Sequence, residues 1–234
     1  MTDRIPEEIR DASAEELLHW AFTEFGDGIA IASSFGAEDM VLLDIASKVA
    51  ERPRVFTLDT GRLPEETYAL VDRARERYGI GIEVYFPDTS AVEEMERSFG
   101  VNLFYRSIED RKRCCDVRKM EPLRRAMAGL DGWVCGLRRE QAVTRAEVAK
   151  IEIDGGNGGI LKFNPLADWT LDELWGYIRE NDVPYNALHD KGYPSIGCAP
   201  CTRAVAEGED IRAGRWWWEA PEHKECGLHA KRAS

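Results

Sequence analysis

The sequence predicts an α/β fold, a mostly parallel sheet with helices on both faces, followed by a C-terminal arm. Over the first two thirds of the chain, short apolar runs of strand length alternate with amphipathic runs of helix length. Strands that are separated by helices pair in parallel and need cover on both faces. Beyond Cys201 the chain becomes polar and irregular. We therefore expect residues 1–202 to form the α/β domain and residues 203–234 the arm.

Local signals mark the ends of the predicted elements. The six strands are expected at residues 28–32, 54–58, 82–86, 132–136, 146–153 and 160–163. Ser or Thr at a helix start can accept hydrogen bonds from the unpaired backbone N–H groups there, and glycine or proline often marks a helix end. Helices are expected from Ser13 to Gly26, from about Ala37 to Ala50, after Pro64, from Asp116 to Pro122, and from Thr170 to Asn181.

Composition and charge limit the classes of function. The chain has 234 residues, of which 44% are hydrophobic and 32% charged, and its formal net charge is −12. These values are ordinary for a globular protein, while the acidic balance argues against a surface that coats nucleic acid. No apolar run approaches the roughly 20 residues of a membrane helix, and the N-terminus lacks the apolar stretch of a signal peptide. We expect a cytoplasmic protein with no membrane or nucleic-acid partner.

The cysteines carry the most specific information about chemistry. Disulfides rarely persist in the cytoplasm, so six cysteines are better explained as metal-binding or catalytic residues. Four of them form two close pairs, Cys114 with Cys115 and Cys198 with Cys201. Adjacent cysteines suit a single tetrahedral zinc ion poorly, whereas a cluster with a separate iron for each sulfur tolerates them. The spacing favours iron–sulfur over zinc, and a redox dithiol at the second pair is a third interpretation.

The two remaining cysteines differ from each other. Cys226 lies near the C-terminus with His223 and His229 close by, and a thiolate beside cations is a good nucleophile. We expect Cys226 to enter and leave an active site on its terminal segment. Cys135 lies in an apolar strand and is expected to be a small buried residue.

Several features suit a small anionic ligand. Residues 33–39 join a strand to a helix start, where hydroxyls and backbone N–H groups could hold a phosphate. Residues 59–62 follow the next strand and could contact the same ligand. Arg212 and Arg215 would share a face if their segment is helical, and arginine binds phosphate or sulfate through two parallel hydrogen bonds.

A cation is also expected beside the cysteine tandem. If the helix includes the tandem, Lys119 lies four residues after Cys115 and shares its face, as Arg118 does with Cys114. The properties of a cluster depend on such neighbouring charges.

Together these motifs resemble those of the assimilatory adenylyl-sulfate reductases, within the phosphoadenylyl-sulfate reductase family. The resemblance covers residues 28–229, and its most specific elements are the two cysteine pairs and the Glu-Cys-Gly-Leu-His at 225–229. It implies an adenine nucleotide α-hydrolase-like fold. Residues 1–202 would bind the nucleotide, and the arm would carry the catalytic Cys226. The implied cofactor is a [4Fe–4S] cluster on Cys114, Cys115, Cys198 and Cys201.

The resemblance also implies a substrate site. Residues 33–39 resemble the family's modified pyrophosphate loop, in which Phe35 and Glu38 depart from the pattern of ATP pyrophosphatases. Such a loop should hold a phosphosulfate rather than split ATP. Lys119 matches the lysine that bridges cluster and substrate. The full set assigned to substrate binding is Ser33, Ser34, Gly36, Leu58, Gly61, Lys119, Arg145, Arg212, Arg215 and His229.

The implied reaction is a reductive transfer. The Cys226 thiolate attacks the sulfur of adenylyl sulfate, AMP leaves, and an S-sulfocysteine forms. No second cysteine lies beside Cys226, so an external dithiol, thioredoxin or a glutaredoxin, is expected to release sulfite. The cluster is expected to act through its charge and to stay redox-silent.

Three other interpretations remain. A phosphoadenylyl-sulfate reductase would perform the same chemistry on a substrate with an extra 3′-phosphate. An ATP-dependent RNA thiolation enzyme would need a basic face and an intact pyrophosphate loop. A zinc module with four cysteine ligands would leave Cys226 without a purpose. The sequence leaves the oligomeric state open, a homo-oligomer included.

Overall fold

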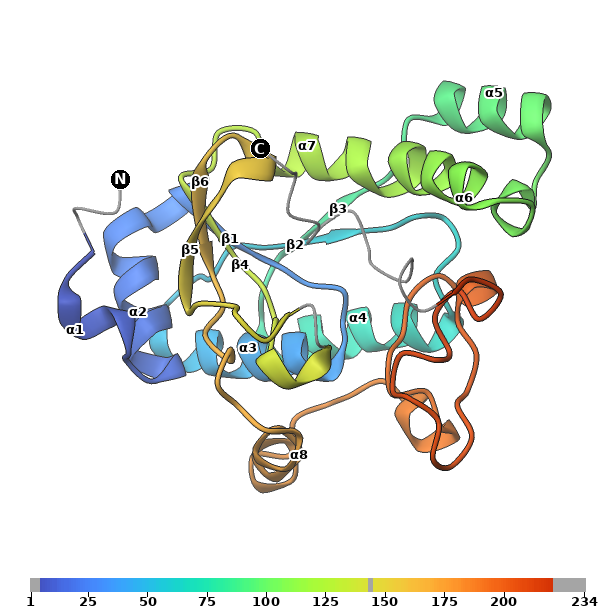
Figure 1. Ribbon diagram of the computed structural model, residues 1–234. Coiled ribbons are helices and arrows are strands. Elements are labelled where there is room, and N and C mark those ends of the chain that lie inside the picture. The colour runs from blue at the N-terminus through green and yellow to red at the C-terminus, as the bar shows by residue number, and fades with distance from the viewer. Residues whose placement is uncertain (1–4, 143–144, 221–234) are drawn as a thin grey trace. The chain divides into compact units, whose positions relative to one another are not determined.

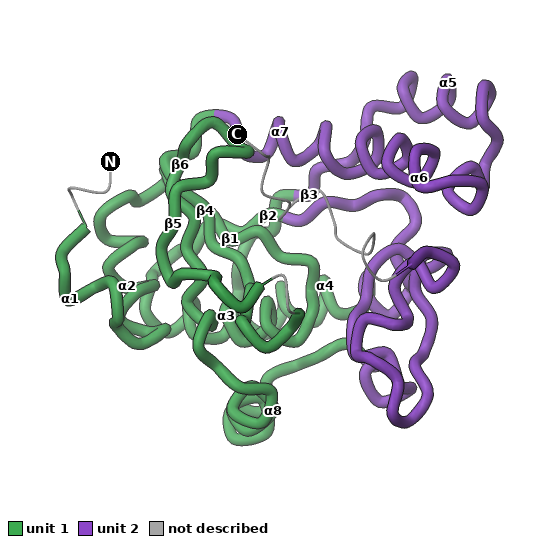
Figure 2. The backbone as a smooth tube through the Cα atoms, in the orientation of Figure 1, with its two compact units in different colours: residues 1–56, 69–83, 129–186 green, residues 57–68, 84–128, 187–234 purple. Residues whose placement is uncertain are grey.

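The structure of the chain is a computed structural model that describes residues 5–142 and 145–220. These residues divide into two compact units, which Figure 2 shows in green and purple. Unit 1 comprises residues up to 56, 69–83 and 129–186, and unit 2 comprises residues 57–68, 84–128 and those from 187 onward. Residues 203–220 belong to unit 2, and the predicted boundary at residue 202 stays a prediction.

A six-stranded, mostly parallel sheet organises the fold, as predicted. The strand order is β3-β2-β1-β4-β6-β5. β1 pairs in parallel with β2 and with β4, β4 pairs in parallel with β6, and β5 is antiparallel to β6 at the edge (Figure 1). The strands are β1 (Ile29–Ala32), β2 (Val55–Leu58), β3 (Ile82–Tyr85), β4 (Gly132–Val134), β5 (Ile151–Asp154) and β6 (Ile160–Phe163).

Helices alternate with these strands along the chain. The helix ends show the expected local chemistry: Ser13 and Thr170 each accept a hydrogen bond from a backbone N–H three residues on and form capping boxes. The helices are α1 (Glu7–Arg10), α2 (Ala14–Phe25), α3 (Ala37–Val49), α4 (Glu65–Tyr78), α5 (Thr89–Phe99), α6 (Ile108–Cys115), α7 (Glu121–Met127) and α8 (Leu171–Glu180). None of these described helices is both long and apolar enough to cross a bilayer.

Two predicted boundaries were wrong. The strand expected at residues 146–153 begins only at Ile151, because a turn at residues 146–147 and irregular backbone at residues 148–150 precede it. The helix expected to end at Pro122 instead continues from a π-helical turn, Asp116–Met120, into α7. Pro122 lies in the first turn of α7, where its missing N–H would have no helical partner in any case.

Unit 1 has the larger apolar core. Its helices α2, α3 and α8 contribute residues such as Leu17, Leu42 and Leu174, and the sheet contributes Ile31 and Phe163, all of them fully buried. The apolar side chains of the helices and of the sheet are shielded from water and closely packed. This core therefore fixes the ends of the strands and the loops that leave them.

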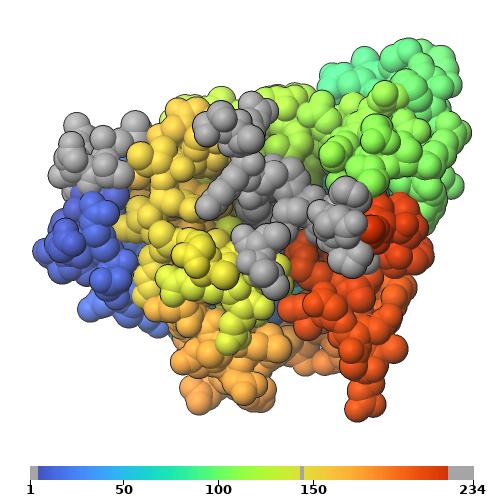
Figure 3. Space-filling model, viewed as in Figure 1, coloured from blue at the N-terminus to red at the C-terminus, as the bar shows by residue number. Residues whose placement is uncertain are grey.

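Unit 2 has a smaller core that includes cysteines. Buried residues of α5, α6 and the C-terminal segment pack into one cluster: Met95, Leu103, Phe104, Cys114, Cys201 and Trp216. Residues 203–220, at the red end of the colour scale in Figure 3, form turns and irregular segments rather than helices. Backbone hydrogen bonds from Arg203 to Gly214 and from Trp216 to Cys201, together with the buried Trp216 ring, hold this segment.

Candidate active site

The carboxyl ends of β1 and β4 mark a topological switch point in unit 1. β1 has β2 on one side and β4 on the other, so the chain leaves these neighbouring strands in opposite directions across the sheet. In open α/β sheets, ligands bind beside the carboxyl ends of strands at such a point. Residues 33–39, predicted to hold a phosphosulfate, follow β1 directly and occupy this position.

Internal hydrogen bonds hold the loop after β1. Ser34 donates from its backbone N–H and its hydroxyl to one carboxylate oxygen of Asp39, at 2.6 and 2.7 Å. Ser33 Oγ accepts the N–H of Phe35 at 3.2 Å. Phe35 has a positive φ of 58° and is 1% exposed. Burial of its ring offsets this unfavourable backbone conformation. Gly36 then caps α3, and its carbonyl accepts the N–H of Met40.

The two carboxylates at the start of α3, Glu38 and Asp39, both have partners. Glu38 pairs with Arg138 at 3.0 Å, and the Arg138 side chain is 2% exposed. Burial raises the pKa of Asp39 to about 6, against the hydrogen bonds from Ser34. The pairing of Glu38 with Arg138 and the hydrogen bonds from Ser34 to Asp39 reduce the repulsion of an anion at this helix start. The helix dipole and backbone N–H groups there can therefore attract a phosphate.

Gly136, just after β4, approaches this loop closely. A Cβ at Gly136 would lie 2.7 Å from both Asp39 Oδ1 and Glu38 Cβ. The Gly136 carbonyl accepts a hydrogen bond from Gln141 Nε2 at 3.1 Å. Buried Arg145 in turn donates to Gln141 Oε1. Arg145, which was predicted to bind substrate, is thus connected through Gln141 to the loop after β4.

The residues expected to contact adenosine follow β2. Leu58 is the last residue of that strand, and Gly61 lies three residues later with a positive φ of 69°. The Gly61 N–H donates to Asp59 Oδ1 at 2.8 Å. A Cβ at Gly61 would lie 3.1 Å from the Phe86 ring, so both backbone conformation and space favour glycine here.

The four cysteines predicted as ligands gather in unit 2. Cys114 and Cys115 end α6, and Cys198 and Cys201 flank a short 3₁₀ turn. Buried Cys114 and Cys201 share the apolar cluster, with Cys198 packed against it. Burial raises the pKa of Cys201, and Cys198 and Cys115 raise it further. Thiols that are far apart in the sequence thus lie near one another, and no disulfide joins any of them among the described residues.

Cations and a hydroxyl surround these thiols. Burial raises the pKa of Cys114, while the charges of Arg118 and Arg62 lower it. Thr60 Oγ1 lies 3.1 Å from Cys198 Sγ. Positive charge and hydrogen-bond donors near sulfur stabilise the thiolate form that binds metals.

Two features bear on what the cysteines could hold. Among the described residues, no three His, Cys, Asp or Glu side chains converge as the ligands of one metal ion do. Adjacent cysteines suit a single tetrahedral ion poorly, whereas a cubane takes one thiolate at each iron. Four buried N–H donors of the same unit have no partner among the described residues, namely Arg118 Nε, Arg215 Nε, Trp216 Nε1 and Trp218 Nε1. Buried donors in folded proteins nearly always have a partner, which can be a protein group, an ordered water or a bound group.

The segment after the cysteine tandem is not a regular α-helix. Lys119 is half-buried within the π-helical turn Asp116–Met120. The extra residue per turn alters the four-residue spacing on which the predicted shared face of Cys115 and Lys119 was based. Single π-turns inside helices occur often at functional sites.

The helix considered for Arg212 and Arg215 is not present. A turn links the two residues, with the Arg215 N–H donating to the Arg212 carbonyl at 3.0 Å. Arg215 donates to Ile196 O at 3.3 Å and lies against Gly197, where a Cβ would be 2.4 Å from its Nη2. The Trp216 N–H donates to Cys201 O at 3.1 Å. These contacts hold the segment that contains Arg212 and Arg215 beside the loop of Cys198 and Cys201.

Two site residues, Gly136 and Arg138, lie outside the loops predicted from the sequence, and they shape the loop region of unit 1. Asp39, Thr60 and Arg62 lie within the predicted loops 33–39 and 59–62, but no individual role was predicted for them. Thr60 and Arg62 lie at the cysteines of unit 2. The glycine and arginines that follow the fourth buried strand were the available signal for the first group. The remaining predicted site residues, Cys226 and His229, lie outside the described residues.

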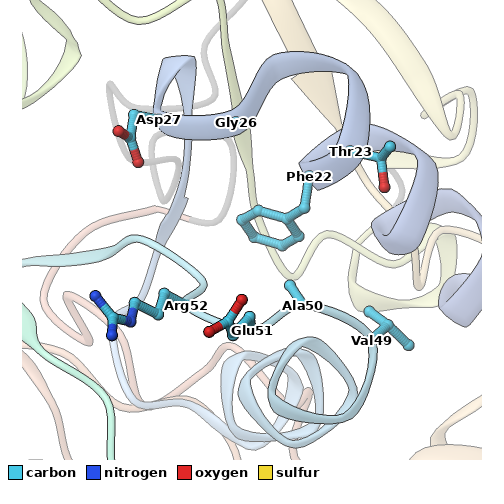
Figure 4. Close-up of a pocket in the computed structure, with 8 residues that line it drawn as sticks. All are labelled: Phe22, Thr23, Gly26, Asp27, Val49, Ala50, Glu51 and Arg52. Atoms are coloured by element: carbon cyan, nitrogen blue, oxygen red, sulfur yellow. The ribbon is translucent and has the colours of Figure 1, made fainter.

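A pocket of about 230 Å³ lies elsewhere in unit 1. The end of α2 and the chain before β2 line it, with the Phe22 ring pointing into the space between them (Figure 4). It is smaller than most ligand sites, which are about 300–1,000 Å³. It also lies at the amino ends of β1 and β2, opposite to the switch point, so we assign it no role in substrate binding.

Comparison with known proteins identifies the family. Residues 28–204 match the phosphoadenosine phosphosulfate reductase domain. The chain belongs to this family. It is 54% identical over 230 residues to the adenosine 5′-phosphosulfate reductase of Allochromatium vinosum, an alignment that covers 98% of this chain and 88% of the relative.

Solved structures agree with this family and fold. The phosphoadenylyl-sulfate reductase of Candida auris, crystallised with phosphate, superposes with a TM-score of 0.71 at 31% identity, over 83% of this chain and 91% of that one. The FMN adenylyltransferase of Candida glabrata superposes with a TM-score of 0.56 at 15% identity, over 94% of this chain and 74% of that one. The second similarity concerns the fold alone, which is adenine nucleotide α-hydrolase-like as expected.

Proposed function

We propose that this protein reduces adenylyl sulfate to sulfite and AMP in sulfate assimilation. The observation that carries the proposal is the gathering of four cysteines in unit 2, two of them buried, in a chain that is 54% identical to a protein named for this reaction. The loop at the switch point of unit 1 is suited to the phosphate of a nucleotide.

Cys114, Cys115, Cys198 and Cys201 would hold a [4Fe–4S] cluster. When bound, the cluster supplies a fixed charge and sulfur acceptors near the substrate. The unpartnered donors of Arg215 and Trp216 support this assignment. Burial raises the pKa of Cys114, and the charges of Arg118 and Arg62 partly offset this and so favour the thiolate that ligation requires.

The substrate would be held by both loops and by cations. Ser33, Gly36 and the N–H groups at the start of α3 would bind phosphate, whereas Ser34 shapes the loop, since its N–H and hydroxyl already bond Asp39. Leu58 and Gly61 would contact adenosine. The sulfate and phosphate charges would be stabilised by Lys119, Arg145, Arg212, Arg215 and His229. Donors aimed at developing charge contribute about 3 kcal/mol each to a transition state.

The Cys226 thiolate would carry the chemical step. It attacks the sulfate sulfur, a sulfur–sulfur bond forms, and the bond from sulfur to the phosphate oxygen breaks, so that AMP leaves with the electron pair. An external dithiol then attacks Cys226 Sγ and releases sulfite, and its second thiol closes a disulfide. The dithiol loses two electrons, which reduce the sulfate sulfur to sulfite. Thioredoxin or a glutaredoxin is the proposed donor, and the cytoplasm, where such dithiols are kept reduced, is the proposed location.

A second candidate is the same reduction of phosphoadenylyl sulfate. It is favoured by the likeness to the Candida auris enzyme of that name. Competition between the two nucleotides, which differ only in the 3′-phosphate, separates the candidates. RNA thiolation is disfavoured by the net charge of −12.

Replacement of the nucleophile tests the proposed reaction. The anaerobically purified protein should form sulfite and AMP from adenylyl sulfate with a dithiol donor. Cys226→Ser should abolish sulfite formation while nucleotide affinity and iron content stay unchanged. Retained turnover in this variant would contradict the mechanism.

A further inference from the structure

Glu96 of α5 lies where two arginines of unit 2 meet. Its Oε1 accepts hydrogen bonds from Arg118 Nη2 at 2.5 Å and from Arg62 Nη2 at 3.2 Å. The Glu96 side chain is 28% exposed, Arg118 8% and Arg62 17%. At this burial the ion pairs are weakly screened, and charge-assisted hydrogen bonds are short and directional. Glu96 thus fixes both guanidinium groups.

The two arginines in turn hold residues 60–62. Arg118 Nη1 donates to the Thr60 carbonyl at 2.8 Å, and a Cβ at Gly61 would lie 3.4 Å from the same nitrogen. Arg62 Nη2 also donates to the Val101 carbonyl at 2.7 Å. The loop is therefore held at its first residue by Arg118 and at its last residue by the Arg62 side chain.

The same loop contacts the Cys-x-x-Cys segment. The Ala199 N–H donates to the Arg62 carbonyl at 2.8 Å, and Thr60 Oγ1 lies against Cys198 Sγ. Residues 60–62 thus lie between the cysteines and Glu96. Without Glu96, the contacts on the cysteine side and the bond from Arg62 to the Val101 carbonyl would remain, but the two guanidinium groups would lose the acceptor that they share.

We propose that Glu96 is a positioning residue for the substrate, fixing residues 60–62 through Arg62 and Arg118 in the conformation that contacts the nucleotide. The inference rests on the proposed function, because it requires this loop to contact adenosine. Glu96 does not touch the substrate. A loop that is ordered before binding loses less conformational entropy on binding, so the effect of Glu96 falls on affinity and not on the chemical step.

Substitutions on α5 test this role. Glu96→Ala removes the acceptor of both arginines, and Glu96→Gln keeps one acceptor oxygen without the charge. Glu94→Ala is the matched control, since Glu94 lies on the same helix, is 66% exposed and pairs with Arg97 on the surface. In iron-loaded protein, Glu96→Ala should raise the KM for adenylyl sulfate and the Kd for AMP about tenfold, and Glu96→Gln about threefold. The kcat, the iron content and the control should match the wild type.

Three results would overturn the proposal. The first is an AMP affinity of Glu96→Ala within about twofold of the wild type. The second is a fall in kcat at unchanged KM. The third is loss of iron together with loss of affinity in both variants, which would assign Glu96 to the integrity of the cysteine site. If Glu96→Ala does not fold, Glu96→Gln carries the test. AMP binding is measured by calorimetry without turnover, so a wild-type protein that binds AMP but does not reduce adenylyl sulfate refutes the proposed function alone.

Discussion

The loop after β1 in unit 1 bonds its serine and aspartate side chains internally, whereas the cysteine region of unit 2 contains buried donors that have no partner among the described residues. Ser33, Ser34 and Asp39 bond within the loop, and Arg138 pairs with Glu38. In unit 2, the side-chain nitrogens of Arg118 (Nε), Trp216 and Trp218 have no acceptor among the described residues.

The unpartnered donors indicate that the cysteine region of unit 2, and not the loop of unit 1, lacks acceptors. A buried donor without a partner costs about 1–3 kcal/mol, so unit 2 retains several such costs until acceptors are supplied. Trp216 also has a positive φ of 41°, an unfavourable conformation for a residue with a side chain. We infer that unit 1 presents a preformed anion site, and that unit 2 becomes fully satisfied when its cysteines bind a cluster.

The largest expected effect is a difference in iron content and activity between serine variants of two buried cysteines, Cys201 and Cys135. Cys201→Ser should lose the cluster and all activity, because the serine hydroxyl is a poor iron ligand. Cys135→Ser should keep about four irons per chain, because Cys135 lies in unit 1 and its thiol donates to Asn164 Oδ1, a bond that serine can also make. Iron analysis and the visible absorption spectrum check this. Iron retained in Cys201→Ser, or lost from Cys135→Ser, would contradict the assignment.

Asp39 should make the stability of unit 1 depend on pH. Its pKa is raised from 3.8 to about 6 in the folded protein, so the native state binds its proton more tightly than the unfolded state. The stabilising contribution is present below pH 3.8 and is lost as the pH rises through about 6. Relative to Asp39→Asn, the wild type should lose about 2–3 kcal/mol of unfolding free energy across that window.

Hydrogen exchange of β1 and α3 amides, corrected for intrinsic rates, measures this difference. Because both proteins share all other titrating groups, comparing them isolates Asp39. A difference that stays constant between pH 4 and 7 would show that Asp39 keeps its ordinary pKa.

Gly136→Ala should have a smaller effect, confined to unit 1. The new methyl group would lie 2.7 Å from Asp39 Oδ1 and Glu38 Cβ, and overpacking of this kind costs about 1–3 kcal/mol. Gly81→Ala is the control, because a Cβ there meets nothing within 4 Å. We expect weaker AMP binding and a lower melting temperature for Gly136→Ala alone, measured by calorimetry. Equal behaviour of the two variants would mean that the loop adapts freely.

The sequence predicted the sheet well because burial patterns are local. The last strand was predicted at residues 160–163 and lies there, and Ser13 and Thr170 cap helices as expected. The strand at 146–153 was placed too early because apolar and polar residues alternate in the turns before Ile151 as well. The continuation through Pro122 was missed because proline stops a helix in its interior but not in its first turn.

The sequence predicted some residues of the site and missed others, for a physical reason. The cysteine pairs were identifiable because few side chains serve as cluster ligands, and their sequence spacing is distinctive. Glu96 and Arg138 were not identifiable, because their importance depends on burial and on partners distant in sequence. A charged residue in a helix has the same sequence signal whether it faces water or fixes a loop.

The most direct test of the contrast between the two regions is hydrogen exchange on iron-loaded protein and on protein stripped by a chelator. The account predicts faster exchange after iron removal in α6 and at residues 198–202 and 215–216, with unchanged exchange in β1 and α3. Equal acceleration in both units, or no change near the cysteines, would contradict the claim that a bound cluster completes unit 2 while the loop of unit 1 is preformed.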